Sequence, residues 1–318
     1  MTNKKKNSLR IGLLILLSFL SGLFYLFFNI RGSWEFALYL RIPKLIAFFI
    51  VSVCISFATI PFQTMTENHL LSPSIIGIDS LYTFFQTLTV FYFGSQSILN
   101  TNVAINFILS TVLVLGASLG LFYLFFKKIP NQIYLMLLFG VTLRTLVSSL
   151  NQFLQVIIDP NEYTIVLSKT LTSFNQINVF LIGLTILVAI PCVLYLSLNS
   201  KVLDVIHLGR DYASSLGIEV DQQYLKFFMI ISILTATTTS LVGPVSFLGF
   251  LGANISYRLF YTYKHRILFV GSSLVTFLIL ISGQTIVEHV FLTQTTLGVV
   301  IDFIGGLYFI LLLMKERD

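Results

Sequence analysis

The chain has 318 residues, of which 56% are hydrophobic and only 10% are charged, and its formal net charge is +6. Soluble globular domains average about 25% charged residues, so this composition excludes an ordinary soluble enzyme and indicates a polytopic membrane protein. The positive charge is accounted for by membrane topology and does not indicate nucleic acid binding.

Apolar runs long enough to cross a membrane recur along the whole chain. A spanning helix needs about 20 mostly apolar residues. We therefore predict an all-α membrane protein with a single domain, residues 1–318, and ten transmembrane helices, of which the seventh and eighth are short. The predicted spans are residues 11–29, 43–60, 73–93, 102–126, 132–150, 177–197, 226–241, 243–260, 267–287 and 297–314.

The distribution of basic residues predicts the orientation. With ten spans and the N-terminus inside, Arg144 falls within a span and the outside segments contain only Arg31, Arg41, Lys44 and Lys169. The other lysines and arginines lie inside, in agreement with the positive-inside rule. Both termini are therefore predicted to be cytoplasmic. The first apolar run has no small-x-small cleavage site and is predicted to be an uncleaved helix.

Residues 198–225 form the one sizeable hydrophilic segment on the cytoplasmic side. Two short helices are expected at 201–207 and 211–216, broken at Gly209, with Asp211 available as an N-cap and Gly217 as a C-cap. The outside loops are too small to form a domain that captures a dilute solute. The charged segment predicts docking of a soluble partner, and the alternative is a solvated loop on the membrane surface.

The sequence contains no motif of a familiar enzyme. Gly-x-x-x-x-Gly-Lys-Ser/Thr, His-Glu-x-x-His and Gly-x-Ser-x-Gly are all missing from it, so ATP hydrolysis by a phosphate-binding loop, zinc proteolysis and serine hydrolysis are not expected of this chain. Cys54 and Cys192 lie in separate predicted spans, where buried thiols behave as small apolar residues.

Two ionisable residues fall within predicted spans. Such residues are costly in a membrane and are functional candidates, so Asp79 and Arg144 could form an ion or proton site. The alternative for Asp79 is a position near the inner end of its span, facing water or a helix N-terminus. For Arg144, packing within the bundle and lining of a pathway are equally compatible with the sequence.

Several segments, in order along nearly the whole chain, resemble motifs of one transporter family. The chain is similar to permeases of the FecCD-type ABC importers, which take up iron-siderophore complexes, haem and vitamin B12, and the resemblance also implies ten spans. The matching segments are Arg41-Ile42-Pro43-Lys44, residues 69–77 (His-Leu-Leu-Ser-Pro-Ser-Ile-Ile-Gly), residues 210–218 (Arg-Asp-Tyr-Ala-Ser-Ser-Leu-Gly-Ile) and residues 243–249 (Gly-Pro-Val-Ser-Phe-Leu-Gly) followed by Arg258.

Other segments resemble one branch of that family. Residues 77–82, 159–162 and 303–309 are similar to the branch that serves catecholate siderophores of the petrobactin kind. Gln284 and Thr296 stand where the family commonly has Asp and Pro, and His69-Leu70 replaces Asn-Pro, so the chain departs from the vitamin B12 branch. The resemblance implies an ATP-driven permease for ferric siderophores, with a haem or vitamin B12 permease as the alternative.

The resemblance also implies roles for the matching residues. Arg41 and Lys44 would receive acidic residues of a binding protein, unless they only snorkel to the membrane surface. Gly243, Pro244 and Gly249 would form a helix break beside the pathway, with plain helix packing as the alternative. The residues that would couple the permease to an ATPase are Arg210, Asp211, Ala213, Ser214, Leu216, Gly217 and Ile218.

The implied assembly is a bacterial plasma-membrane importer. Its other parts would be a second permease subunit, two ATP-binding subunits that hold ATP and magnesium, and an extracytoplasmic siderophore-binding protein, with lipid around the permeases. No cofactor or metal is expected on this chain. Two rival functions are an ion-coupled secondary carrier built on Asp79 and Arg144, and a membrane scaffold or sensor that recruits a soluble protein through residues 198–225.

The orientation gives a first prediction. Green fluorescent protein fused after Asp318 should fluoresce, and alkaline phosphatase fused at the same place should be inactive, because both reporters would lie in the cytoplasm. Fusions within residues 151–176, the longest predicted outside loop, should show the opposite pattern. An active phosphatase at the C-terminus would contradict ten spans with a cytoplasmic N-terminus.

Overall fold

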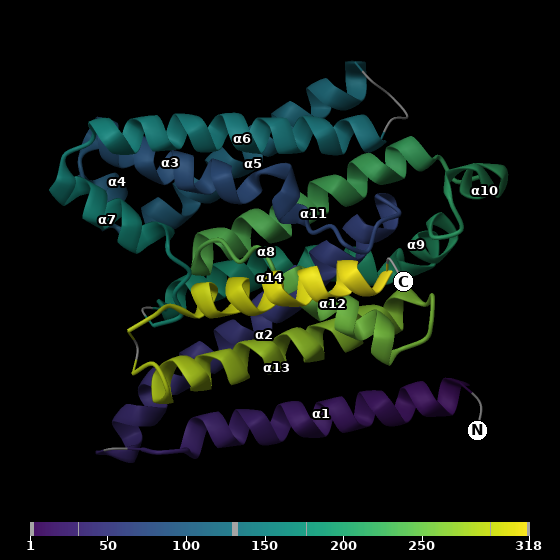
Figure 1. The fold of residues 1–318 in the computed structure, drawn as a ribbon, viewed down its shortest axis with the longest axis horizontal. Helices are drawn as coiled ribbons and strands as arrows, with labels where there is room; N and C mark the ends of the chain where they lie inside the picture. Colours follow the sequence, from purple (N-terminus) through teal and green to yellow (C-terminus); the bar gives the residue numbers. More distant parts are fainter. Residues whose placement is uncertain (1–2, 31, 129–132, 176, 293, 317–318) are drawn as a thin grey trace.

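The computed structural model is a bundle of helices (Figure 1), and it describes residues 3–30, 32–128, 133–175, 177–292 and 294–316, among which no strand occurs. The shorter helices are η1 (Pro73–Ile76), α4 (Ile98–Thr101), α7 (Pro160–Thr170), α9 (Ser200–Ile206) and α10 (Arg210–Ser215). The longer ones are α1 (Asn3–Phe27), α2 (Trp34–Met65), α3 (Ile78–Phe93), α5 (Val103–Lys128), α6 (Ile133–Ile157), α8 (Val179–Leu198), α11 (Val220–Val242), α12 (Leu248–Leu259), α13 (His265–His289) and α14 (Leu297–Glu316).

Each predicted span overlaps one of the longer helices, and eight of these, within the described residues, are long and apolar enough to cross a membrane. The exceptions are α3 and α12, with 16 and 12 residues. At 1.5 Å per residue they extend about 24 and 18 Å, less than the ~30 Å hydrocarbon core. The 3₁₀ helix η1 and Gly77 precede α3, and non-helical backbone precedes α12, so the continuous runs predicted at 73–93 and 243–260 are corrected to shorter α-helices. Ten crossings remain a prediction.

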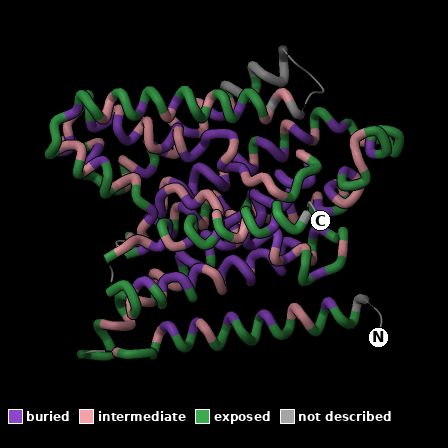
Figure 2. The backbone as a smooth tube through the Cα atoms, in the orientation of Figure 1, coloured by how far each residue is buried: buried purple, intermediate pink, exposed green. Residues whose placement is uncertain are grey.

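The helices divide into a buried group and an outer group. The spanning windows of α2, α13 and α11 are 72%, 67% and 61% buried, whereas those of α1 and α6 are 22% and 17% buried. Figure 2 shows the exposed face of α6 on one side of the bundle and that of α1 on the other. Large apolar side chains such as Leu16, Phe19 and Leu146 are exposed there. Apolar surface on this scale is stable in lipid, and the chain is a multi-pass membrane protein.

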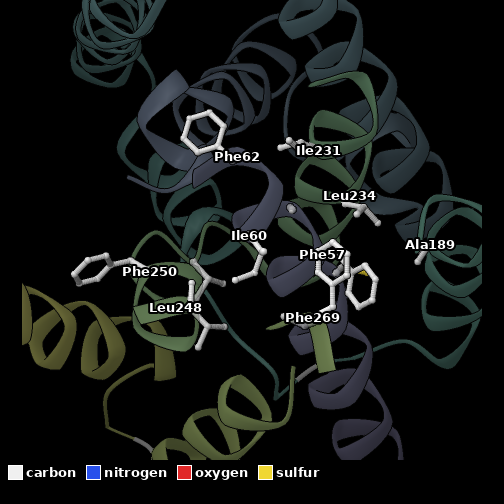
Figure 3. Packing of buried hydrophobic residues seen from close by; sticks show 14 of the residues in the cluster. Phe57, Ile60, Phe62, Ala189, Ile231, Leu234, Leu248, Phe250 and Phe269 are labelled. Carbon is white, nitrogen blue, oxygen red and sulfur yellow. The ribbon is translucent and has the colours of Figure 1, made fainter. Parts of the chain in front are cut away.

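The core is packed around α2 (Figure 3). The rings of Phe57 on α2 and Phe269 on α13 are stacked, with centroids 4.3 Å apart. Leu248 from α12 and Leu234 from α11 are completely buried in the same cluster. Because α2 contacts helices from both halves of the sequence, it fixes their relative positions.

Polar side chains also join α2 to α13. The hydroxyl of Ser272 donates to Ser56 Oγ over 3.1 Å, and Ser56 and Thr276 hydroxyls are 3.2 Å apart. Gly252 of α12 lies against Thr276, so closely that an added Cβ would collide with the threonine hydroxyl. Small residues let helices approach at this point, as is common in membrane bundles.

The start of α1, the end of α14 and the α9–α10 segment lie at one end of the molecule, while α4 and α7 lie at the other (Figure 1). Arg31, counted as an outside residue in the sequence, lies outside the described residues. Residues 198–225, the charged segment, therefore lie at one end of the molecule, and short loops and α7 form the opposite end.

The charged segment folds as two short helices, with one correction. Gly209, with φ of +100°, precedes α10 at the N-cap position predicted for Asp211, which instead lies in the first turn. At the other end, Ile218 N–H donates to Ala213 O and Gly217 N–H donates to Ser214 O. This is a Schellman motif, and Gly217 has the positive φ, +84°, that it requires.

Helix α7 was not predicted from the sequence, although its start carries a recognisable signal. Asp159 accepts a hydrogen bond from Asn161 N–H, and Pro160 occupies the first helical position. An Asp-Pro pair of this kind favours a helix start. Glu162 then accepts two bonds from Ser95, and Lys169 Nζ donates to Asn100 O, so one end of α7 is attached to the loop after α3 and the other to α4.

The approach of α12 to α13 gives a prediction for stability. Gly252→Val should lower the free energy of unfolding by about 1–3 kcal/mol, since the added atoms overpack the contact with Thr276. Thermal unfolding of the purified protein in detergent measures this. Gly183→Ala is the control, because its Cβ meets nothing within 4 Å. Equal unfolding temperatures for the two variants would contradict the close approach.

Candidate functional site

The helix break between α11 and α12 is the centre of the candidate site. Val242 and Gly243 are buried in the bundle, and a helix break there frees backbone carbonyls, which are costly to bury unless the protein itself supplies donors. Ser173 N–H donates to Val242 O over 2.9 Å, Thr172 Oγ1 donates to Pro244 O, and Ser72 Oγ donates to Ser246 O over 3.3 Å. Residues 171–173 and the segment before η1 therefore hold the break together.

Gly243 is required at this break for two reasons. Its φ is +88°, which side chains rarely adopt, and an added Cβ would lie 3.0 Å from Thr172 Cα and 3.1 Å from Leu171 O. Gly298, at the start of α14, also lies directly against Thr172. Thr172 is thus enclosed between the break and α14.

Asp79 links a second helix start to the same break. It lies in the first turn of α3, and 6% of the residue is exposed. Its carboxylate accepts hydrogen bonds from Ser246 Oγ at 3.1 Å and from Thr239 Oγ1 at 3.3 Å. The carboxylate therefore joins α3, α11 and Ser246, which lies shortly before α12.

The hydroxyl-rich stretch of α11 has a mixed role. Thr235, Thr237 and Thr238 each donate to a carbonyl four residues earlier in their own helix, a pattern common for threonine in membrane helices. Thr239 instead reaches Asp79. One threonine of the run therefore contributes to a contact between helices, while the others satisfy their hydroxyls locally.

These groups surround a small buried cavity. Asp79, Thr239, Ser246 and Gly249 line it together with Thr59 of α2. Its volume is about 20 Å³, which is room for roughly one water molecule. Small-molecule sites usually measure about 300–1,000 Å³, so the cavity is too small to bind a bulky solute. We call the hydrogen-bonded cluster of Asp79, Thr239 and Ser246 around it the polar joint.

Arg41 and Lys44 lie at the opposite end from α10 and are engaged within the chain. Arg41 Nη1 donates to three carbonyls at the end of α1, those of Tyr25, Leu26 and Phe28. Lys44 Nζ lies 3.3 Å from Glu288 Oε1 on α13, and its side chain is 17% exposed. Both cations therefore stabilise helix ends, and they line an open cleft of about 620 Å³.

The other candidate residues are spread over the molecule. Arg144 is exposed on α6, with its Cβ 3.1 Å from where a Cβ of Gly77 would lie. Its backbone packs on the turn before α3, while the hydrogen bonds of Asp79 run to Thr239 and Ser246. Ala213 is fully buried, so it cannot belong to a docking face. Among the residues predicted to couple the permease to an ATPase, the exposed ones are Asp211, Ser214, Leu216 and Gly217.

Within the described residues, no group of three or more His, Cys, Asp or Glu side chains is placed to hold a metal ion. The site nevertheless contains residues that sequence reasoning missed, namely Thr172, Ser173 and Ser246. Ser246 belonged to the recognised Gly-Pro-Val-Ser motif and could have been found there. Thr172 and Ser173 carried no local signal, because their role depends on a break about 70 residues later in the chain.

The matching family model covers the bundle and the break together. The model of the FecCD transport family matches residues 8–315. The chain belongs to the FecCD transport family. As a family member it is a transporter subunit and not an enzyme, and the break at Gly243 lies inside the matched region.

Two relatives with known roles are similar over most of their length. The petrobactin import system permease protein YclO of Bacillus subtilis is 41% identical over 98% of this chain and 99% of its own. The petrobactin import system permease protein FatC of Bacillus anthracis is 32% identical over 87% of this chain and 78% of its own. Both are permeases of import systems.

A solved structure shows the same fold. A metal-chelate type ABC transporter in an inward-facing conformation superposes with a TM-score of 0.85, covering 97% of this chain and 99% of that chain, at 19% identity. At this identity the likeness concerns the fold, including the arrangement of long helices around α2.

The hydrogen bonds of Asp79 give a prediction. Asp79→Leu removes an acceptor shared by two hydroxyls and should lower the free energy of unfolding by about 1–3 kcal/mol. Asp79→Asn keeps one acceptor oxygen and should cost less. Thermal unfolding compares both with Asp211→Asn, an exposed carboxylate on α10. If Asp79→Leu unfolds at the wild-type temperature, the joint does not depend on this carboxylate.

Proposed function

We propose that this chain is the permease subunit of an ATP-driven importer of ferric siderophores, of the catecholate type that includes petrobactin. The observation that carries the proposal is the 41% identity to a petrobactin import permease over almost the full length of both chains. FatC, the other relative whose name contains petrobactin, supports the same substrate class.

The proposed assembly contains two permeases, two ATP-binding subunits and an extracytoplasmic binding protein. The sequence has no phosphate-binding loop, so ATP and its magnesium ion would be held by the partner subunits. The buried cavity of about 20 Å³ cannot contain a chelate. A path for the siderophore is therefore proposed between this chain and a second permease, with ten spans and cytoplasmic termini in each.

Residues 198–225 are proposed to be the coupling segment, which receives the movement of the ATPase. Tyr212 on α10 and Leu216 directly after it are 70% and 65% exposed, at the same end as the start of α1 and the end of α14. Arg210 bonds Asp221 of α11 over 2.7 Å. Together with the turn at Gly217, this contact fixes α10 against α11, so that α10 can transmit force as a rigid unit.

Docking of a binding protein on Arg41 and Lys44 is proposed in a modified form. Acidic residues of that protein would have to share Lys44 with Glu288 and Arg41 with the end of α1. Such contacts would steer association more than they would add affinity. The rival ion-coupled carrier is not proposed, because the chain belongs to the FecCD transport family.

Uptake of iron-loaded petrobactin into cells tests the proposal. Cells without this protein should lose uptake, and Gly217→Trp should reduce it by about tenfold or more, because a side chain at φ +84° disrupts the Schellman turn. Ser215→Ala, an exposed change on α10, is the control, with the membrane level of each variant measured in parallel. Unchanged uptake without the protein would remove the siderophore assignment.

A further inference from the structure

A buried histidine lies between the coupling segment and the transmembrane core. His265 is the first residue of α13 and is 1% exposed. Its backbone N–H and its ring Nδ1 both contact Asp204 Oδ1 on α9, at 2.8 and 2.7 Å. Its Nε2 lies 2.8 Å from Thr64 Oγ1 on α2. One side chain therefore connects α9, α13 and α2.

Each contact in this chain of hydrogen bonds has a donor and an acceptor. Burial raises the pKa of Asp204, but hydrogen bonds from the His265 ring and backbone outweigh it, so the net pKa is below the usual 3.8. The carboxylate is thus ionised at neutral pH and accepts Nδ1–H. The Thr64 hydroxyl has one hydrogen, which it donates either to His265 Nε2 at 2.8 Å or to Ile60 O of its own helix at 3.0 Å. The connection from Asp204 through His265 to Thr64 is complete when that hydrogen is donated to Nε2.

The connection leads from the coupling segment to the polar joint. Thr64 is five residues after Thr59 on α2, which is about one and a half helical turns. Thr59 lines the buried cavity and lies directly against Gly249 of α12. A displacement of α9 that moves Thr64 must therefore move the α2 surface on which α12 rests, since packed interiors transmit strain.

A second contact between α9 and α13 does not extend to α2. Arg266 Nε donates to Ser200 Oγ over 3.1 Å, but Arg266 is exposed at the edge of the bundle. His207 is near His265, with ring centroids 6.2 Å apart. Burial and the neighbouring His265 lower the pKa of His207, so that ring is neutral at neutral pH and does not compete as a cation for Asp204.

We propose that Asp204, His265 and Thr64 form the mechanical link through which movement of the coupling segment reaches α2 and α13, with His265 as a positioning residue. The link rests on the proposed function, because it acts only if an ATPase moves residues 198–225. It deepens that function by naming the contacts through which the movement enters the membrane bundle.

The test is the amount of ferric petrobactin transported per ATP hydrolysed by the complete importer in liposomes. Thr64→Val keeps the branched shape and removes only the hydroxyl, and His265→Phe keeps a ring and removes both nitrogens. Each should lower the ratio by about threefold to tenfold, the range expected for residues that couple two sites. ATP hydrolysis itself should continue, which a merely structural loss of assembly would not allow.

Matched controls lie beside both positions. Thr66, two residues after Thr64, bonds only carbonyls of its own helix, those of Phe62 and Gln63. Tyr263, two residues before His265, is exposed. Thr66→Val and Tyr263→Phe should keep the wild-type ratio. Asp204→Asn combined with His265→Phe should be no worse than the more severe single variant, because both break one connection.

The possible outcomes separate the link from the function on which it rests. A wild-type importer that moves no ferric siderophore overturns the proposed function. A transporting wild type whose Thr64→Val and His265→Phe variants keep its ratio overturns the link alone, as does a double variant whose defects multiply. If His265→Phe fails to assemble, Thr64→Val decides the question, since it removes a single hydroxyl from α2.

Discussion

The structure depends on one constraint, which is that backbone groups freed in the buried interior of the bundle must be bonded by the protein itself. The break between α11 and α12 frees the carbonyls of Val242, Pro244 and Ser246, and neighbouring segments supply a donor to each. Asp79 completes the arrangement by accepting from Ser246 and Thr239. The positions of α3, α12 and residues 171–173 all follow from satisfying this one break.

The same constraint limits what a single chain can do. A joint filled by hydrogen-bonded groups leaves about 20 Å³, so it holds helices together and provides no room for a chelate. Transport by a FecCD family member must then use space outside this joint. We propose that the movement enters through residues 198–225, and the Asp204–His265–Thr64 connection joins them to α2, whose Thr59 lines the joint.

Charged residues in this chain have partners that their position in the sequence does not reveal. Lys44 and Arg41 resemble a free cationic rim, yet one pairs with Glu288 and the other closes the end of α1. Asp79 resembles an ion site, yet it accepts from two hydroxyls. Asp79 is buried and the two cations are partly buried, so an unpaired charge would be costly, and the fold supplies each with a partner.

Properties that depend on neighbouring residues could be predicted from the sequence, because hydropathy and basic residues act locally. They gave the all-α membrane class, a long helix near each predicted span and the two short helices of residues 198–225. The start of α12, the burial of Ala213 and the partners of Asp79 and His265 were decided only by the tertiary structure. These contacts join residues such as Asp79 and Ser246, or Thr64 and His265, which are 167 and 201 positions apart. No local pattern encodes which distant helix will pack against a given side chain.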